Sequence, residues 1–149
     1  MSTITIQNQG DMGAVVSRVL EHVNAQDAAA VVALHGELGA GKTTFVQILA
    51  KALGVSEAVT SPTFVIMKQY ELPEEKNGLR ELIHIDAYRI DDENEMTPLR
   101  FTELLATPGT LVCVEWAEKI KNLLPKNLID VSINITNQDG GREISIHGT

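Results

Sequence analysis

The sequence has little of several features that commonly decide a protein's class. It holds one cysteine, Cys113, so no disulfide can form within the chain, and the apolar run 111–114 around it predicts a buried, inert thiol. No apolar run approaches the roughly 18 residues that a membrane span needs. Residues 1–5 also lack the basic and apolar segments of a signal peptide. We therefore expect a cytoplasmic protein that makes no contact with a membrane.

Basic residues are scarce as well. Twelve Lys and Arg residues stand against 20 Asp and Glu, for a net charge of −8. Proteins that bind nucleic acid directly gain affinity by neutralising phosphates, and no dense basic cluster is present to do so. Any role in nucleic-acid metabolism is therefore expected to run through protein partners. The length of 149 residues and the hydrophobic content of 44% predict one globular domain over residues 1–149.

Against this background, the stretch 36–43 stands out because it matches G-x-x-x-x-G-K-[ST] at every fixed position. Glycines allow a tight turn in which successive N–H groups face the oxygens of a phosphate. Lys42 is placed to reach the β- and γ-phosphates, and the Thr43 hydroxyl to ligate magnesium. The loop thus predicts a nucleotide and Mg²⁺ as ligands. The residues expected around the nucleotide in this loop are Glu37, Leu38, Gly39, Ala40, Gly41, Lys42, Thr43 and Thr44.

The flanks of this loop favour the same interpretation. Residues 28–34 form a continuous apolar run, as expected of a strand that is covered on both faces. After the loop, apolar residues recur at helical spacing over 42–53, and Gly54 follows as a C-cap. Strand, glycine loop and helix in this order predict a phosphate-binding loop (P-loop) in an α/β fold.

The rest of the chain predicts a mixed sheet with antiparallel hairpins, flanked by helices. Strands are expected at 3–7, 64–72, 79–85, 111–114, 131–135 and 144–146, with turns at 73–78 and 139–141. Helices are expected at 12–23 behind an Asp11 N-cap, from Pro98 after an acidic loop at 91–97, and at 117–124. The fold class is therefore α/β, with one P-loop domain.

Two of the predicted strands end in a carboxylate. The strand at 79–85 runs into Asp86, and the strand at 111–114 runs into Glu115. Ligands of α/β sheets gather at the carboxyl ends of strands, so both acids are candidate catalytic residues beside the glycine loop. Glu115 is the better candidate for the metal and Asp86 for the attacking water, although the reverse assignment stays open.

Other polar residues allow two interpretations each. Three hydroxyls in Thr60-Ser61-Pro62-Thr63 form either a loop that enters a strand or a loop that senses the γ-phosphate. Arg89 is either a surface residue or a group that stabilises charge on the phosphoryl group. His84 alternates within a strand, which favours a hydrogen-bonded structural histidine over a general base.

These motifs together resemble one family. The glycine loop, Ser61-Pro62-Thr63-Phe64, the pattern His84-x-Asp86-x-Tyr88-Arg89 and Glu115-Trp116 occur in this order within 149 residues. The combination resembles TsaE (also called YjeE), the small bacterial ATPase that serves threonylcarbamoyladenosine modification of tRNA. The resemblance covers nearly the whole chain, down to Arg142.

The resemblance implies a compact P-loop α/β domain in which Lys42 and Thr43 hold ATP and magnesium. Asp86 and Glu115 would be the acids needed for hydrolysis, and Trp116 would lie beside the nucleotide. It further implies that the protein works with TsaD, which transfers threonylcarbamoyl to adenosine 37, and with TsaB. ATP hydrolysis would reset this complex between turnovers, and tRNA would be contacted only indirectly.

The sequence departs from the family in two places. Met12 stands where the family usually has a threonine near the nucleotide base, and no glycine occurs near Phe101, where the family tends to place one. Two other functions share the glycine loop. A small-molecule kinase usually carries a lid with several arginines, whereas the arginines of this sequence are scattered along the chain. A GTPase-like binding module usually carries an [NT]-K-x-D sequence, which this chain lacks.

Overall fold

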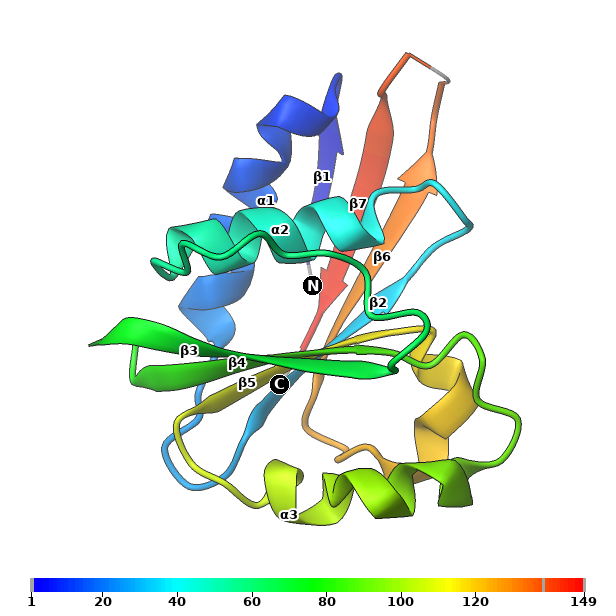
Figure 1. Cartoon of the computed structure of the whole chain (residues 1–149). Helices are drawn as coiled ribbons and strands as arrows, with labels where there is room; N and C mark the ends of the chain where they lie inside the picture. The colour runs from blue at the N-terminus through cyan, green and yellow to red at the C-terminus, as the bar shows by residue number, and fades with distance from the viewer. Residues whose placement is uncertain (1, 138, 149) are drawn as a thin grey trace.

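The computed structural model describes residues 2–137 and 139–148, with the backbone alone for Gln9, and it is built on one seven-stranded sheet (Figure 1). The strands are β1 (Ser2–Ile6), β2 (Ala30–His35), β3 (Met67–Lys76), β4 (Leu79–Asp86), β5 (Thr110–Glu115), β6 (Ile129–Ile135) and β7 (Arg142–His147). The α-helices are α1 (Met12–His22), α2 (Lys42–Ala52) and α3 (Phe101–Leu105). Three 3₁₀ segments complete the elements: η1 (Gln9–Asp11), η2 (Glu93–Leu99) and η3 (Ala117–Leu123).

The sheet is parallel at its centre and antiparallel at both edges. Its order is β1-β7-β6-β2-β5-β4-β3. Strands β6, β2, β5 and β4 are parallel neighbours, while β7 and β1 extend one edge and β3 the other in antiparallel fashion. The carboxyl ends of the central strands therefore meet at one edge of the sheet, where α/β proteins bind their ligands.

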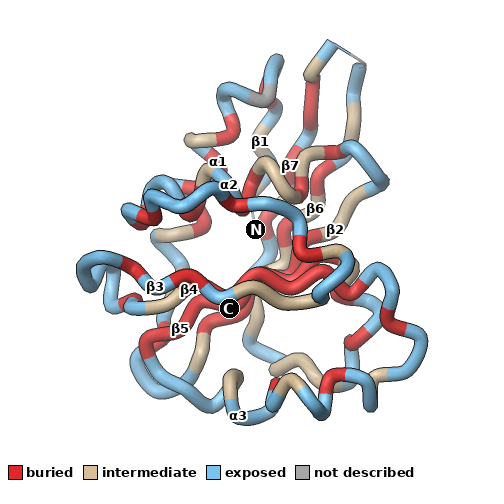
Figure 2. The backbone as a smooth tube through the Cα atoms, viewed as in Figure 1, coloured by how far each residue is buried: buried red, intermediate tan, exposed pale blue. Residues whose placement is uncertain are grey.

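Each face of the sheet has its own hydrophobic core. Along β2, Val32 and Leu34 point into a core shared with α1 and α2, whereas Val31 and Ala33 point into a core beneath α3, η2 and η3. Figure 1 shows the two groups of helical segments on opposite sides of the central strands. Buried residues follow the central strands almost without interruption (Figure 2). The continuous apolar runs in the sequence arise because both faces of these strands are covered.

The two long helices confirm the expectations from spacing. Helix α1 buries Met12, Val15, Val16 and Val19, although the side chain of Asp11 makes no capping hydrogen bond. Helix α2 ends at Ala52 with Leu53 as its C-cap, so Gly54, which has φ of +89°, lies one residue beyond the cap that the sequence predicted for it. The N–H groups of Gly54 and Val55 donate to the carbonyls of Lys51 and Ala50, which is the Schellman pattern of a helix end.

The predicted bounds of the first hairpin are wrong at both ends of β3. The strand begins at Met67 rather than at residue 64, because Ile66 has φ of +69° and breaks the extended backbone. It then continues through Pro73 to Lys76, and the turn contracts to Asn77 and Gly78. Proline is tolerated because β3 is an edge strand and because Pro73 lies where its pairing with β4 is interrupted, between Glu71 and Lys76.

The single helix expected from Pro98 is wrong: η2 begins earlier, at Glu93, and α3 follows from Phe101 after a break at Arg100, whose φ is +56°. Asp92 caps η2 by accepting from the N–H of Asn94, and the Glu95 carboxylate accepts from the N–H of Asp92. This capping box overrides the acidic, loop-like composition of 91–97. The predicted strand at 131–135 also begins two residues earlier, and its hairpin with β7 is present as expected. Among the described residues, no helix is long and apolar enough to cross a membrane.

Candidate functional site

A cleft of about 360 Å³ lies at the carboxyl ends of β2, β4 and β5. It is lined by Leu38, Gly39, Gly41, Lys42, Thr43, Thr44, Ser61, Thr63, Asp86, Tyr88, Glu115 and Trp116. Four segments that are distant in the sequence therefore meet here, namely the glycine loop, the loop at 60–63, the end of β4 and the end of β5.

The glycine loop takes a course that side chains would obstruct. Gly36 follows β2 with φ of +152°, and a Cβ atom there would lie 2.6 Å from the carbonyl oxygen of Ile133 on β6. Gly41 precedes α2 with φ of +118°. Helix α2 thus begins directly at the cleft, where its first N–H groups and the positive end of its dipole favour an anion.

Lys42, the first residue of α2, is buried beneath this loop. Its Nζ atom donates to the carbonyl of Gly36 and lies 3.9 Å from the centroid of the Trp116 ring. Burial lowers the pKa of the Lys42 ammonium, while the charges of Glu115, Glu118 and Asp86 partly offset this by favouring the protonated form. The ammonium is thus held by a carbonyl oxygen and an aromatic ring. The nearby carboxylates would repel an anion bound in the cleft.

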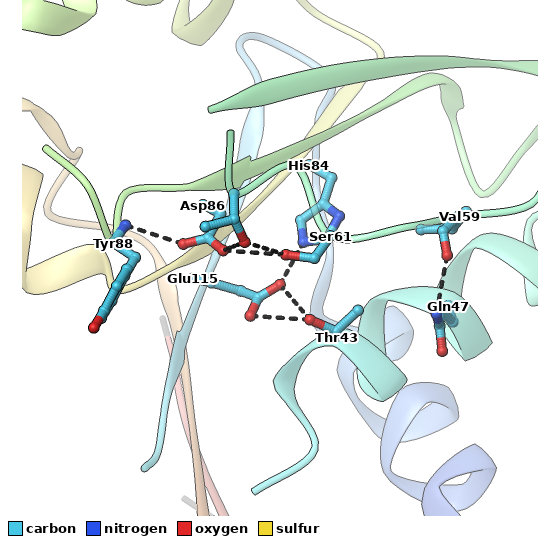
Figure 3. A network of polar contacts seen from close by, with 9 residues as sticks. Thr43, Gln47, Val59, Ser61, His84, Asp86, Tyr88 and Glu115 are labelled. Carbon is cyan, nitrogen blue, oxygen red and sulfur yellow. Dashed lines mark hydrogen bonds and ion pairs between the residues drawn. The ribbon is translucent and has the colours of Figure 1, made fainter. Parts of the chain in front are cut away.

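Glu115 ends β5 within reach of the second residue of α2. The Thr43 hydroxyl donates to the Glu115 carboxylate, with distances of 3.0 and 3.2 Å from Oγ1 to Oε2 and Oε1 (Figure 3). His84 on β4 lies behind the carboxylate, with Nε2 2.6 Å from Oε2. Because a carboxylate only accepts, Nε2 of His84 carries the hydrogen, and the buried Nδ1 has no partner in the described structure.

Asp86 ends β4 directly beside Glu115, since the two residues are register partners on adjacent parallel strands. Its Oδ2 atom accepts from Thr63 at 2.9 Å and from Ser61 at 3.2 Å, and its Oδ1 atom accepts from the N–H of Tyr88 at 3.0 Å (Figure 3). The loop at 60–63 is therefore tied to Asp86 rather than merely leading into a strand. Both predicted acids are brought to one site, and each has a different set of partners.

Trp116 has an unusual backbone conformation for an aromatic residue. Its φ and ψ are 58° and 43°, in the left-handed region that bulky side chains rarely adopt. This turn ends β5 and directs the indole over Lys42 and toward Tyr88, whose ring centroid lies 5.2 Å away. Backbone strain of this kind is commonly retained at functional sites, where surrounding contacts hold it.

Most of the predicted binding residues line the cleft, and two do not. Glu37 is exposed at the outer side of the loop, and Ala40 is fully buried against the core. Met12, which the resemblance placed near the nucleotide base, is also fully buried in the core and lies outside the cleft lining. Arg89 does not line the cleft either, because its guanidinium lies 4.6 Å over the ring of Phe64.

Sequence reasoning missed the positions of three other residues. Tyr88 lines the cleft, and its place two residues after Asp86 was the available signal. His84 is buried as expected of a structural histidine, but its partner proves to be Glu115 itself. Arg142 contacts the glycine loop from β7, and no local pattern could have indicated a contact across 102 residues.

Within the described ranges, no group of three or more His, Cys, Asp or Glu side chains is arranged to hold a metal ion. Thr43 and Glu115 nevertheless place a hydroxyl and a carboxylate within 3.2 Å of each other at the start of α2. Magnesium in nucleotide sites takes most of its ligands from phosphates and water, with one or two from the protein. The two oxygen donors therefore fit such an ion.

Strand β2, the glycine loop and α2, with an acid at the end of the adjacent parallel strand, define an α/β protein of the P-loop class. The family described as "Threonylcarbamoyl adenosine biosynthesis protein TsaE" matches residues 6–144. The chain belongs to the TsaE family.

Similar proteins agree with this assignment. The chain is 37% identical to the tRNA threonylcarbamoyladenosine biosynthesis protein TsaE of Treponema pallidum, over 94% of this chain and 93% of the relative. It is 40% identical to the protein of the same name from Bacillus subtilis, over 77% of this chain and 67% of the relative. The crystal structure of Bacillus subtilis YdiB superposes with a TM-score of 0.75 at 28% identity, covering 99% of this chain and 84% of that one. The expected family and fold class are thereby confirmed.

Proposed function

We propose that this protein is an ATP-binding, magnesium-dependent ATPase that acts in threonylcarbamoyl modification of adenosine 37 in tRNA. The observation that carries the proposal is the meeting of Thr43 and Glu115 at the start of α2, with Asp86 beside them on the neighbouring strand. A glycine loop, a hydroxyl and two acids are the parts that magnesium-assisted hydrolysis of a nucleoside triphosphate requires. The pathway is the one named for its relatives.

Glu115 is the candidate for the metal side of the site. It is buried, it already accepts from Thr43, and His84 fixes its orientation from behind. A bound magnesium ion would neutralise charge on the phosphates and replace the Thr43 hydrogen as the partner of this carboxylate. Thr43 and Glu115 together would hold it.

Asp86 is the candidate for orienting the attacking water. Two hydroxyls and one N–H hold its carboxylate at the edge of the cleft, one strand farther from the glycine loop than Glu115. This separation gives the two acids distinct positions, one near the start of α2 and one beside the loop at 60–63. The geometry therefore favours the assignment of Glu115 to the metal and Asp86 to the water.

Partner proteins are expected at the mouth of the cleft. Large hydrophobic residues are exposed there, with exposed fractions of 84% for Leu38, 83% for Phe64, 57% for Val65 and 51% for Tyr88. Leu38 and Tyr88 line the cleft itself, and Phe64 and Val65 directly follow Thr63. Such a surface fits contact with another protein. We assign it to the TsaD and TsaB proteins, whose complex ATP hydrolysis would reset in the cytoplasm, while tRNA is contacted only through them.

The proposal is tested with Lys42→Ala, Glu115→Gln and Asp86→Asn, using Glu103→Gln on the exposed part of α3 as the control. The single tryptophan, Trp116, lies over Lys42, so its fluorescence reports nucleotide binding directly. Lys42→Ala should lose ATP binding. The two acid variants should keep much of the binding but lose phosphate release by about a hundredfold or more, as for other groups that stabilise a transition state.

Phosphate release is measured with and without TsaD and TsaB, and it should be slow without them because none of the described arginines lines the cleft. Undiminished hydrolysis in both acid variants would contradict the site assignment. Transfer of phosphate to a small acceptor would show a kinase instead. Displacement of ATP by GTP at comparable concentrations would show a guanine-nucleotide binding module.

A further inference from the structure

Arg142, the first residue of β7, lies buried beneath the glycine loop with 5% of its surface exposed. Its guanidinium donates to four backbone carbonyls. Nε lies 2.7 Å from the oxygen of Ala40 and Nη2 lies 3.3 Å from that of Gly39, both in the loop. Nη1 lies 2.9 Å from the oxygen of Gly141 and 3.4 Å from that of Asn137, both in the β6–β7 hairpin.

These hydrogen bonds fix two consecutive peptide groups of the loop. The C=O and N–H of one peptide group point in opposite directions, because the group is planar and trans. The Ala40 carbonyl faces Arg142, so the N–H of Gly41 is turned to the other side, where Gly41 lines the cleft. The preceding peptide is held at both ends, since the Gly39 carbonyl accepts from Arg142 and the Ala40 N–H donates to Glu37.

The charge of Arg142 has a second consequence. Buried arginines are usually paired with a carboxylate, yet no ion pair within residues 2–137 and 139–148 involves Arg142. Among the described residues, its positive charge is balanced by carbonyl dipoles alone, directly beneath the loop whose Gly41 N–H is turned toward the cleft. The net field of this buried cation therefore favours negative charge in the cleft.

Local hydrogen bonds hold the described part of the hairpin that carries Arg142. The Asn137 side-chain oxygen accepts from the N–H groups of Asp139 and Gly141 at 2.9 and 3.1 Å, so one side-chain amide holds two backbone groups of the turn. Strand β6 also runs beside the loop, because its Ile133 carbonyl closes the space at Gly36. Figure 1 shows β6 next to β2, with β7 beyond it, on the side of β2 away from β5.

We propose that Arg142 is a positioning residue that sets the phosphate-binding conformation of the glycine loop from the β6–β7 hairpin. This inference rests on the proposed binding of a nucleotide. It concerns binding rather than the chemical step, because Arg142 contacts neither Thr43, Asp86 nor Glu115. Directed hydrogen bonds are required in addition to charge, since a single ammonium cannot span the carbonyls of both the loop and the hairpin.

The test compares Arg142→Lys and Arg142→Met with the unchanged protein. Arg18→Met serves as the control, because Arg18 is an exposed arginine on α1 whose guanidinium donates, within the described part of the chain, to the Ser2 hydroxyl alone. ATP affinity is read from Trp116 fluorescence, and KM and kcat from phosphate release with TsaD and TsaB present. Both Arg142 variants should raise the dissociation constant and KM by about ten- to a hundredfold, a typical effect of a misplaced binding group, and leave kcat within about threefold.

A merely structural role gives a different result, in which part of the protein is inactive, kcat falls and KM stays unchanged. That outcome, or unchanged affinity in folded Arg142→Lys, would overturn the proposal. Failure of Arg142→Lys to fold would do the same, because this variant keeps the size and charge and would then show a role in folding alone. If instead the unchanged protein binds no ATP, or Lys42→Ala binds it equally well, the proposed function fails rather than the role of Arg142.

Discussion

The contact between Gly36 and β6 offers a direct test of how the glycine loop is held. In Gly36→Ala, the new Cβ atom would lie 2.6 Å from the carbonyl oxygen of Ile133, so the loop or the strand must move. Gly39→Ala is a matched control in the same loop, because Gly39 also has positive φ, +82°, yet nothing lies within 4 Å of its added Cβ. The two variants separate the backbone strain from the collision.

The magnitudes follow from these two terms. Placing alanine at positive φ costs about 1–2 kcal/mol, and this applies to both variants. Forcing an extra carbon into a packed site costs a further ~1–3 kcal/mol, and this applies only to Gly36→Ala. We therefore expect the free energy of unfolding to fall by about 2 kcal/mol more in Gly36→Ala than in Gly39→Ala. For a chain of this size the difference in Tm is about 4–8 °C.

Thermal and urea denaturation measure the difference, and Trp116 fluorescence measures ATP affinity in the same samples. Gly36→Ala should also weaken ATP binding, because the Gly36 carbonyl accepts from Lys42 and moves with the loop. Gly39 itself lines the cleft, so Gly39→Ala is the control for stability alone. Equal losses of stability in the two variants would refute the reasoning, since the collision would then have been relieved at no cost.

Two further predictions concern charge and reactivity. Glu81 on β4 lies opposite Glu71 on β3. The pKa of the Glu81 carboxyl is raised mainly by burial and to a smaller extent by the like charge of Glu71. The folded state holds the Glu81 proton more tightly than the unfolded state does. The free energy of unfolding therefore falls as the pH rises from the ordinary pKa of a glutamate to the raised pKa in the folded protein. Glu81→Lys should therefore raise the free energy of unfolding by about 0.5–1 kcal/mol at pH 7 and by less near pH 4; an equal gain in Glu75→Lys would contradict this cause. Burial also raises the pKa of the fully buried Cys113 thiol, so a thiol reagent at pH 8 should label it only in urea, and rapid labelling of the native protein would contradict the packing.

The sequence alone was sufficient for the centre of this fold. Residues 28–34 and 111–114 are apolar at successive positions because both faces of β2 and β5 are covered, and such runs are readable without a structure. The helix at 42–53 was equally readable from its spacing and from Gly54. The carboxylates Asp86 and Glu115 came together as expected because parallel strands end at one edge of the sheet.

The errors arose where tertiary contacts outweigh local pattern. Ile66 sits at positive φ although β-branched residues avoid it, so the strand at 64–72 could not be bounded from alternation alone. Pro73 predicted a turn because proline is uncommon within strands. Its place in β3 depends on the edge position of this strand, which is a property of the whole sheet and cannot be read from the local sequence. The partnership of His84 with Glu115 and that of Arg142 with Ala40 join distant segments, and spacing within one segment carries no information about them.

The support that Arg142 gives to the glycine loop has a consequence for the order of events during synthesis. The guanidinium that fixes the Ala40 carbonyl lies 102 residues farther along the chain, and β6, which adjoins β2, also follows the loop by more than 80 residues. A ribosome-bound chain that has released α2 but not the hairpin carries the complete phosphate-binding sequence without the elements that hold its shape. If the loop binds a nucleotide as proposed, we expect this ability to be gained late in translation, when the hairpin emerges and docks, rather than when the loop itself is made.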